Sequence, residues 1–244
     1  MGTQPRNKAL DYERIFEYTR GVLKTPLSWQ NYFWDAYYRK ITPLLSDIIA
    51  RSSRVVFIGI GGGDVVPSLS AEDRAKITGI DVNFRSLLHA REYADVVVAD
   101  GSRLPFADGS IDLVICNQVL HHIIGQGTLD AAIGECARIL KKGGRFVAVE
   151  PNAFHPSGML MNLAARLGIY HRLSGGSDHE FSIPPGRIQN LLKIHGLSPA
   201  NPQAVTFSHP RFPIFMQRMI HAADTRLPDL YLAGLINIYS AVKA

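Results

Sequence analysis

The stretch VVFIGIGGGD, residues 55–64, decides the fold of this chain. An apolar run suited to a buried strand passes directly into a bend that carries Gly59, Gly61, Gly62 and Gly63. Glycine lets a backbone turn sharply and approach a ligand closely, and the amides of such a bend can face that ligand where the next helix begins. The stretch therefore predicts a strand, a tight turn and a nucleotide-like ligand.

Short apolar runs of the same texture lie on both sides of this bend. We predict strands at 54–59, 76–81, 95–99, 111–116 and 145–150, separated by helical spacing at 84–93 and 128–140. This alternation is typical of βα units that build a mainly parallel sheet, so we expect an α/β fold of the Rossmann-like type. The segment 141–144, Lys-Lys-Gly-Gly, is typical of the basic last turn and glycine cap of a helix.

The two flanks of this central region differ from it. Residues 10–50 show helical periodicity with nine large aromatic side chains, and after 151 we expect helices near 157–168 and 184–195 and strands at 204–208 and 235–242. Helix-like apolar spacing fills 210–232. We interpret the chain as an N-terminal helical cap, 1–50, and a main domain, 51–244, with lid insertions near 152–183 and 209–233. The aromatic residues could pack on the main domain, cover an apolar acceptor, or do both.

Composition sets the broad class. The chain has 244 residues, 46% hydrophobic and 19% charged, with a formal net charge of +5. Its basic residues are scattered, so we expect a small-molecule partner and no nucleic acid. We expect a cytoplasmic protein without stable membrane insertion, because no apolar run approaches the roughly 20 residues of a membrane span. Cys116 and Cys136 are expected to be buried thiols, with no disulfide and no metal site; a homodimer stays open.

The glycine bend does not match two common phosphate-binding patterns. The dinucleotide fingerprint, G-x-G-x-x-G, needs glycine at its last position, but that position is Asp64 when the pattern starts at Gly59 and Val66 when it starts at Gly61. A Walker-type loop needs Gly-Lys-Ser/Thr after the glycines, and this chain has none there. Asp81 ends the second predicted strand, where a carboxylate can accept hydrogen bonds from both ribose hydroxyls. An aspartate in this position can also cap a helix, and the glycine bend upstream favours the ribose interpretation.

Four segments in this order resemble the class I S-adenosylmethionine-dependent methyltransferases, in particular the small-molecule group similar to the ubiquinone and menaquinone methyltransferases. They span residues 54–152 and read VVFIGIGGGD, GIDVN, VVVADGSRLPFADGSIDLVICNQVLHHI and ECARILKKGGRFVAVEPN. The resemblance implies a seven-stranded mainly parallel sheet, S-adenosylmethionine as cofactor with S-adenosylhomocysteine as product, and methyl transfer to a small organic acceptor.

The resemblance also implies roles for matched residues. The implied cofactor-binding set comprises Gly59, Gly61 and Gly63 under the methionine part, Asp81 with Val82 at the ribose, Asp100, Gly101 and Ser102 at the adenine, and Asn117 and Gln118 at the end of the fourth strand. The chain departs from the family at Phe57, where an acid is usual two residues before the first glycine. Asp64 could compensate for it.

Methyl transfer to a hydroxyl needs alignment and a base. A histidine of near-neutral pKa suits the task, and His122 and His179 rank first, then His155 and His121, because they follow strand ends or lie in a polar loop near the expected acceptor. A histidine bonded only locally is the alternative for each. We expect an apolar or ring-bearing acceptor, bound by Trp34, Tyr38, Phe154, Phe181 and Phe215.

Several alternatives stay open. The acceptor could be a natural product, a quinone-like compound or a glycan-related molecule, and the methyl could go to carbon or nitrogen in place of oxygen. A non-catalytic cofactor-binding partner would explain Phe57. The string GGGD is also similar to aminopropyltransferases, although ICNQVLHHI lacks their acidic ending of the fourth strand.

Overall fold

The computed structural model describes residues 29–63, 65–124, 127–170, 180–210, 212–224 and 226–244. Its centre is one sheet of strand order β3-β2-β1-β4-β5-β8-β6, with β7 also paired to β8. The strands are β1 (Val55–Ile58), β2 (Ile77–Asp81), β3 (Asp95–Val98), β4 (Ile111–Asn117), β5 (Leu140–Pro151), β6 (Leu197–Pro199), β7 (Gln203–Thr206) and β8 (Ile236–Lys243). Strands β1 to β5 pair in parallel, and β8 is antiparallel to β5. The expected Rossmann-like, mainly parallel sheet is confirmed.

The sheet has eight strands rather than the expected seven, because its last position is divided. On the side of β8 away from β5, Leu197 of β6 pairs with Lys243 while Gln203 of β7 pairs with Ile238. The two strands thus follow one another along the same edge, with a break between them. Pro199 and Pro202 suit an edge, since proline has no N–H for a further ladder bond. The sequence analysis missed β6 because three residues ending in proline carry too little strand signal.

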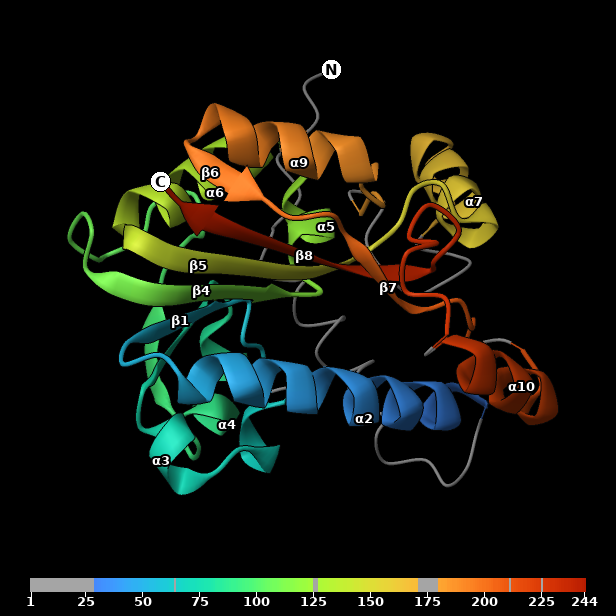
Figure 1. Ribbon diagram of the computed structural model, residues 1–244, viewed down its shortest axis with the longest axis horizontal. Coiled ribbons are helices and arrows are strands. Elements are labelled where there is room, and N and C mark those ends of the chain that lie inside the picture. Colours follow the sequence, from blue (N-terminus) through green and yellow to red (C-terminus); the bar gives the residue numbers. More distant parts are fainter. Residues whose placement is uncertain (1–28, 64, 125–126, 171–179, 211, 225) are drawn as a thin grey trace, which may run out of the picture.

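Helices cover both faces of this sheet (Figure 1). Those of the described residues are α2 (Trp29–Ala50), α3 (Ala71–Arg74), α4 (Phe84–Ala90), α5 (Leu120–Ile124), α6 (Leu129–Ile139), α7 (Pro156–Arg166), α9 (Pro185–Ile194) and α10 (Ile214–Asp224), with a 3-10 turn at Val66–Ser68. Helices α2, α3 and α4 lie on one face, and α5, α6 and α9 on the other. No helix among the described residues is long and apolar enough to cross a bilayer.

The long helix α2 is held on its face by a stripe of large side chains. Every fourth residue is buried, in the series Phe33, Tyr37, Ile41, Leu45 and Ile49. This spacing places one side of the helix against the sheet. The stripe belongs to one apolar cluster with inward residues of β1, β4 and β5. The helical part of the predicted N-terminal cap that the structure describes therefore forms part of the core, which is consistent with the packing interpretation of its aromatic residues.

The predicted strands and helices agree closely with the structure, with one correction. The segment 141–144 was expected to end a helix, but α6 ends at Ile139 and β5 begins at Leu140. Leu140 pairs with Ile111 of β4, so this segment is part of strand β5 and not of a helix cap. The basic residue in the last turn of α6 is Arg138.

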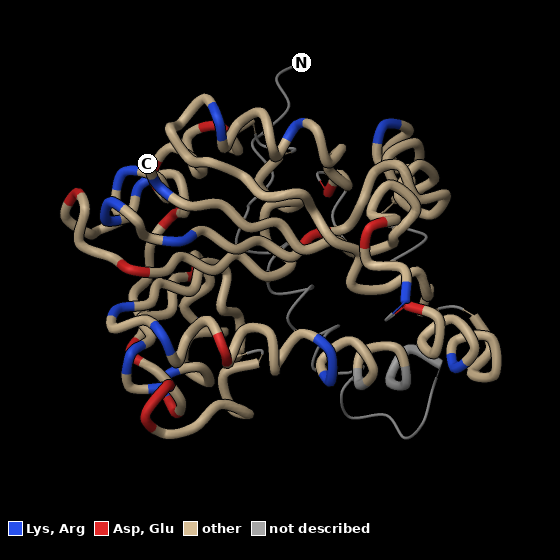
Figure 2. The backbone as a smooth tube through the Cα atoms, in the orientation of Figure 1, with Lys and Arg blue, Asp and Glu red and all other residues tan. Residues whose placement is uncertain are grey.

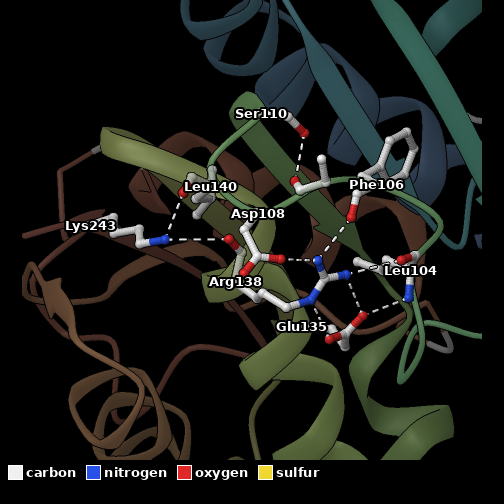
Figure 3. Close-up of polar contacts among 9 residues, drawn as sticks. Leu104, Phe106, Asp108, Ser110, Glu135, Arg138, Leu140 and Lys243 are labelled. Atoms are coloured by element: carbon white, nitrogen blue, oxygen red, sulfur yellow. Dashed lines mark hydrogen bonds and ion pairs between the residues drawn. The ribbon is translucent and has the colours of Figure 1, made fainter.

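Arg138 joins the end of α6 to the loop between β3 and β4 (Figure 3). Its guanidinium donates to Glu135, to Asp108 and to the carbonyl oxygens of Leu104 and Phe106, over 2.6–3.0 Å. Glu135 in turn accepts the N–H of Leu104 at 2.7 Å. A guanidinium presents several donors in a fixed plane, so this network fixes the loop in one conformation. The same loop begins with Asp100, Gly101 and Ser102.

Candidate functional site

Residues from distant parts of the sequence meet where the parallel strands end. Gly59 donates its N–H to the Ile80 carbonyl at 2.7 Å, so the bend after β1 is bonded to the end of β2. The N–H of Gly61 then donates to a carboxylate oxygen of Asp81 at 2.9 Å. In open α/β sheets ligands bind at this edge. The glycine bend and Asp81 therefore form one unit, as the sequence predicts.

The backbone of the bend requires glycine for two different reasons. The φ angles of the bend are positive, at +69° for Gly59, +54° for Gly61 and +118° for Gly63. Residues that carry a Cβ rarely adopt such backbone angles. A Cβ at Gly59 would also lie 2.4 Å from the Val119 side chain, whereas one at Gly61 would meet no atom of the described residues within 4 Å. Gly59 is thus needed for packing, and Gly61 borders open space where a ligand can approach the chain.

Asp81 is a partly buried acceptor. Its second oxygen takes the N–H of Asn83 at 2.8 Å. Burial raises the pKa of Asp81, and the backbone N–H groups of Asn83, Gly61 and Val82 and the charge of His122 oppose this rise only in part. A desolvated carboxylate gains free energy from further hydroxyl donors. Val82 itself is 42% exposed beside it.

The loop after β3 presents a compact polar turn. Asp100 accepts the N–H and the hydroxyl of Ser102, both at 2.8 Å, with the same carboxylate oxygen. A Cβ at Gly101 would lie 3.3 Å from Ile58, so the turn packs closely against the end of β1. The predicted adenine segment is therefore adjacent to the glycine bend.

The end of β4 contributes two amides in different states. Asn117 is buried, and its side-chain oxygen accepts the hydroxyl of Tyr37 from α2. Gln118 has a φ of +54°, and of the described residues other than glycine it alone has a positive φ. Its N–H donates to Val149, while its side-chain nitrogen is buried without a hydrogen-bond partner among the described residues. A buried unpaired donor costs free energy, so Gln118 is suited to a ligand acceptor.

Glu150, at the end of β5, holds the start of α5. The carboxylate is fully buried and accepts the backbone N–H groups of Val119, Leu120 and His121 at 2.9, 2.7 and 3.3 Å. It also lies 2.7 Å from the Nδ1 atom of His121. A carboxylate at a helix start satisfies donors that have no partner within the helix. Glu150 thereby fixes the position of both histidines of α5, and its hydrogen bond occupies the Nδ1 atom of His121.

His122 pairs with Glu180. Its Nδ1 lies 3.4 Å from a carboxylate oxygen of Glu180, and the two side chains are 17% and 8% exposed. Burial by itself lowers the pKa of His122, but the Glu180 hydrogen bond and the charges of Glu180, Glu150 and Asp81 outweigh it and raise the pKa. His122 is thus electrostatically linked to Asp81, the proposed ribose ligand.

His121, His122 and Glu180 place one potential metal-ligand atom each within 4.8 Å of one another. The two imidazole rings lie 4.0 Å apart between centroids with 38° between their planes. The Nδ1 atom of each ring lies beside a carboxylate, that of His121 at 2.7 Å from Glu150 and that of His122 at 3.4 Å from Glu180. The arrangement therefore fits two histidines that are each supported by a carboxylate.

Two further histidines were predicted as candidate bases, His155 and His179. His155 is the N-cap of α7, where its Nδ1 accepts the N–H of Ser157 at 3.2 Å, and burial lowers its pKa. It is therefore a neutral, locally bonded histidine. His179 lies outside the described residues.

The five aromatic side chains expected at the acceptor differ in exposure. Trp34 and Tyr38 are partly buried on α2, where both rings contact Tyr37. Phe154 is 52% exposed and Phe215 is 65% exposed. Phe181 is partly buried and donates its N–H to the His121 carbonyl at 3.1 Å, so it adjoins the histidine cluster.

Three residues that were not predicted from the sequence also lie in this region: Glu150, Glu180 and Tyr37. Glu150 ends a buried strand, which is the same signal that pointed to Asp81. Glu180 and Tyr37 gave no local signal, since the contact of each depends on a residue more than 50 positions away. Phe57 is fully buried in the cluster beneath α2, so the side chain in place of the usual acid serves the core.

These groups fit an adenosyl ligand. The space beside Gly61 can hold a ligand, and the desolvated carboxylate of Asp81 can accept hydroxyls. The side-chain nitrogen atoms of Gln118 and Asn83, which have no partner among the described residues, can donate. The chemistry required of a binding site for S-adenosylmethionine is therefore present at the strand ends.

The central part of the chain is similar in sequence to known methyltransferases. Residues 56–148 match the model of a methyltransferase domain. The chain is 28% identical over 153 residues to a malonyl-[acyl-carrier protein] O-methyltransferase of Legionella pneumophila, with 59% of this chain and 48% of that protein covered. It is 26% identical over 183 residues to a ubiquinone biosynthesis O-methyltransferase of Neisseria meningitidis, with 68% and 75% covered. The chain thus spans about half of the first relative and three quarters of the second.

The fold is also similar to that of solved methyltransferase structures. The structure matches that of an S-adenosylmethionine-dependent methyltransferase of Thermotoga maritima, described as a possible histamine N-methyltransferase, with a TM-score of 0.69 at 18% identity over 96% of this chain and 98% of that one. Residues 56–148 are therefore similar to the methyltransferase domain family, and the chain has the fold of the S-adenosylmethionine-dependent methyltransferases.

Proposed function

We propose that the chain transfers a methyl group from S-adenosylmethionine to a hydroxyl oxygen of a small, apolar, ring-bearing acceptor. The observation that supports the proposal is geometric: Asp81, bonded to the glycine bend, and the pair His122–Glu180 both lie where the parallel strands end. Their charges interact, since Asp81 raises the pKa of His122. In this proposal Asp81 is a cofactor ligand and His122 is the base.

The cofactor would be held by groups already described. The bend Gly59–Gly63 would pass beneath its methionine part, Asp81 would accept the ribose hydroxyls, and the Asp100–Ser102 turn would border the adenine. When bound, the cofactor supplies a methyl group activated by the positive charge of its sulfonium. The protein then has to align the acceptor, exclude water and manage one proton.

His122 would manage that proton. In its neutral form the ring accepts the proton of the acceptor hydroxyl, while the oxygen forms its bond to the methyl carbon and the carbon–sulfur bond breaks. Glu180 stabilises the imidazolium that results, and Glu150 keeps α5 in position. General bases of this kind contribute roughly 10²- to 10⁴-fold to a rate. Because an O–H acceptor needs such a base, the pair favours oxygen over carbon or nitrogen as the methylated atom.

The acceptor class rests on the aromatic residues and on the relatives. Trp34, Tyr38 and Phe181, with Phe154 and Phe215 farther out, would contact a ring-bearing molecule under the lids near 152–183 and 209–233. The Neisseria relative is named for ubiquinone biosynthesis, which supports a quinone-like phenol, and natural-product or glycan-related acceptors are the next candidates. Two free cysteines, Cys116 and Cys136, support a reducing, cytoplasmic setting.

Mass spectrometry of an acceptor panel tests the proposal. The chain is incubated with S-adenosylmethionine and hydroxylated aromatic, quinone-like, polyketide and sugar compounds, and both a methylated product and S-adenosylhomocysteine are measured. We expect both, and their loss in His122→Ala. If the chain binds the cofactor but forms neither product with any acceptor, it is a non-catalytic cofactor-binding protein and the proposal is wrong.

A further inference from the structure

Exposed apolar side chains gather in two short parts of the chain. Of the 20 large hydrophobic residues that are exposed in the described part of the chain, 12 fall within residues 154–169 and 215–232. Soluble monomers rarely leave a large contiguous apolar patch uncovered unless it binds something. These two segments therefore need a physical explanation.

Helix α7 has its small residues inside and its large ones outside. Its buried residues are Gly158, Ala164 and Ala165, and a Cβ at Gly158 would lie 2.1 Å from the Asn152 carbonyl oxygen. The side chains that are more than half exposed are Met159, Leu160, Leu163 and Leu167. Residues four apart lie on one face of a helix, so 159, 163 and 167 form an outward apolar stripe. This is the reverse of a helix that packs on a core.

Helix α10 shows the same inversion. Phe215 and Met219 are 65% and 70% exposed, while the buried residues of the helix are the polar Gln217 and Asp224. Asp224 faces inward and pairs with Lys40 of α2 and with His221. The polar side of α10 is thus anchored to the protein and its apolar side faces outward.

Both helices lie at the end of the molecule where the parallel strands end (Figure 1). Helix α7 follows directly after β5. Asn152, between them, donates its side-chain N–H groups to the carbonyl oxygens of Tyr231, Leu232 and Gly234 at 2.9–3.0 Å. The turn that carries exposed Leu227, Leu230 and Leu232 is therefore fixed beside the start of α7. We call α7, α10 and this turn the apolar end; it lies at the same end of the molecule as the candidate site.

The charges of the apolar end are mainly positive. Arg166, Arg218 and Arg226 are exposed on it, whereas α7 contains no acidic residue and the carboxylate of α10, Asp224, is only 2% exposed. Asp229 in the turn is an exposed acid, so the balance is basic without being uniform. The chain as a whole carries +5. Figure 2 shows the charged positions along the backbone in the same orientation. Exposed apolar stripes flanked by arginine are the pattern of helices that lie in an anionic lipid surface.

We propose that the apolar end docks on the surface of an anionic phospholipid bilayer, with α7 and α10 lying in the interface. The docked chain would face the bilayer with the edge of the sheet that carries the candidate site. A lipid-dissolved acceptor could then reach the site without passing through water. This deepens the proposed function, because it names a membrane-dissolved compound as the acceptor class; the docking itself can be measured without any methyl transfer.

Vesicle co-sedimentation tests the docking. The full chain is mixed with vesicles of phosphatidylglycerol and phosphatidylcholine, or of phosphatidylcholine alone, at low and high salt. We expect sedimentation with the anionic vesicles that weakens with salt. In the variant Leu160→Glu, Leu163→Glu, Met219→Glu we expect about a tenfold or greater loss of bound protein, since charge replaces buried apolar area. Ile194→Glu is the control, because Ile194 is 63% exposed at the end of α9, outside the apolar end.

The outcomes separate the docking from the activity. The same variants are titrated with S-adenosylhomocysteine, and we expect unchanged affinity, which shows that the site is intact. No sedimentation with anionic vesicles, or equal sedimentation of the triple variant, overturns the docking whatever the cofactor affinity. A dimer seen by analytical ultracentrifugation that the triple variant abolishes, without vesicle binding, assigns the apolar end to a second copy and also overturns it.

Discussion

His122 is subject to opposing electrostatic effects. Burial disfavours its charged form, while Glu180, Glu150 and Asp81 favour it, and their sum raises its pKa above the ordinary value of 6.5. A base acts in its neutral form. With a raised pKa the ring stays protonated to a higher pH, so turnover is present above that pKa and is lost as the pH falls through it.

The rate profile against pH tests this balance. We expect kcat to rise with a midpoint above 6.5 and, in Glu180→Gln, to rise at lower pH, because removal of the partner charge lowers the pKa of His122. Asp130→Asn is the control, since Asp130 pairs with the distant His195. A midpoint that Glu180→Gln leaves in place would exclude His122 as the base.

At the scale of elements, two glycines of the bend should have different roles: Gly59 serves packing, and Gly61 serves cofactor binding. For Gly59→Ala we expect a loss of about 2–4 kcal/mol in the free energy of unfolding, from the left-handed backbone and the contact with Val119. Gly61→Ala should lose only about 1–2 kcal/mol, because its space is open. Cofactor affinity should nevertheless fall in Gly61→Ala. Urea unfolding and calorimetry measure the two effects; equal destabilisation of the two variants would contradict the structure.

The Arg138 network is expected to matter for the loop that carries Asp100. Arg138→Met removes donors to Glu135, Asp108 and two carbonyl oxygens, and should cost about 1–3 kcal/mol of unfolding free energy. Hydrogen exchange of the 100–110 amides should become faster as well. Arg51→Met is the control: its exposed pair with Asp47 should contribute less than about 1 kcal/mol. Unchanged hydrogen exchange in Arg138→Met would show that the Arg138 network does not hold this loop.

The elements with strong periodicity were predictable, and those defined by distant pairing were not. Strands β1 to β4 and helices α6 and α9 match their apolar patterns, because burial on a sheet face or helix stripe leaves a local signature. The segment 141–144 was placed wrongly since its glycines suit a cap as well as a strand. Gly61 and Asp81 were predictable because Gly61 lies just after one strand and Asp81 is the last residue of the next. Glu180 lies in a loop, and its contact with His122 arises only in the fold.

At the scale of the whole molecule, no metal ion should be needed for activity. The Nδ1 atom of His121 lies beside Glu150 and that of His122 beside Glu180, so each ring has its own carboxylate partner without a shared cation. Treatment with a chelator followed by dialysis should leave kcat and the unfolding free energy unchanged. Restoration of a lost rate by added zinc or magnesium would reassign these residues as metal ligands.

The central claim is that one adenosyl sulfonium is held between the glycine bend and Asp81. Calorimetric titration of the full chain with S-adenosylhomocysteine tests it directly. We expect one molecule to bind, and the affinity to weaken by about 1–3 kcal/mol in Asp81→Ala. Asp95→Asn is the control, with unchanged affinity, because Asp95 is exposed at the start of β3, the end away from Asp81. No binding to the unmodified chain, or equal affinity in Asp81→Ala, would contradict the account.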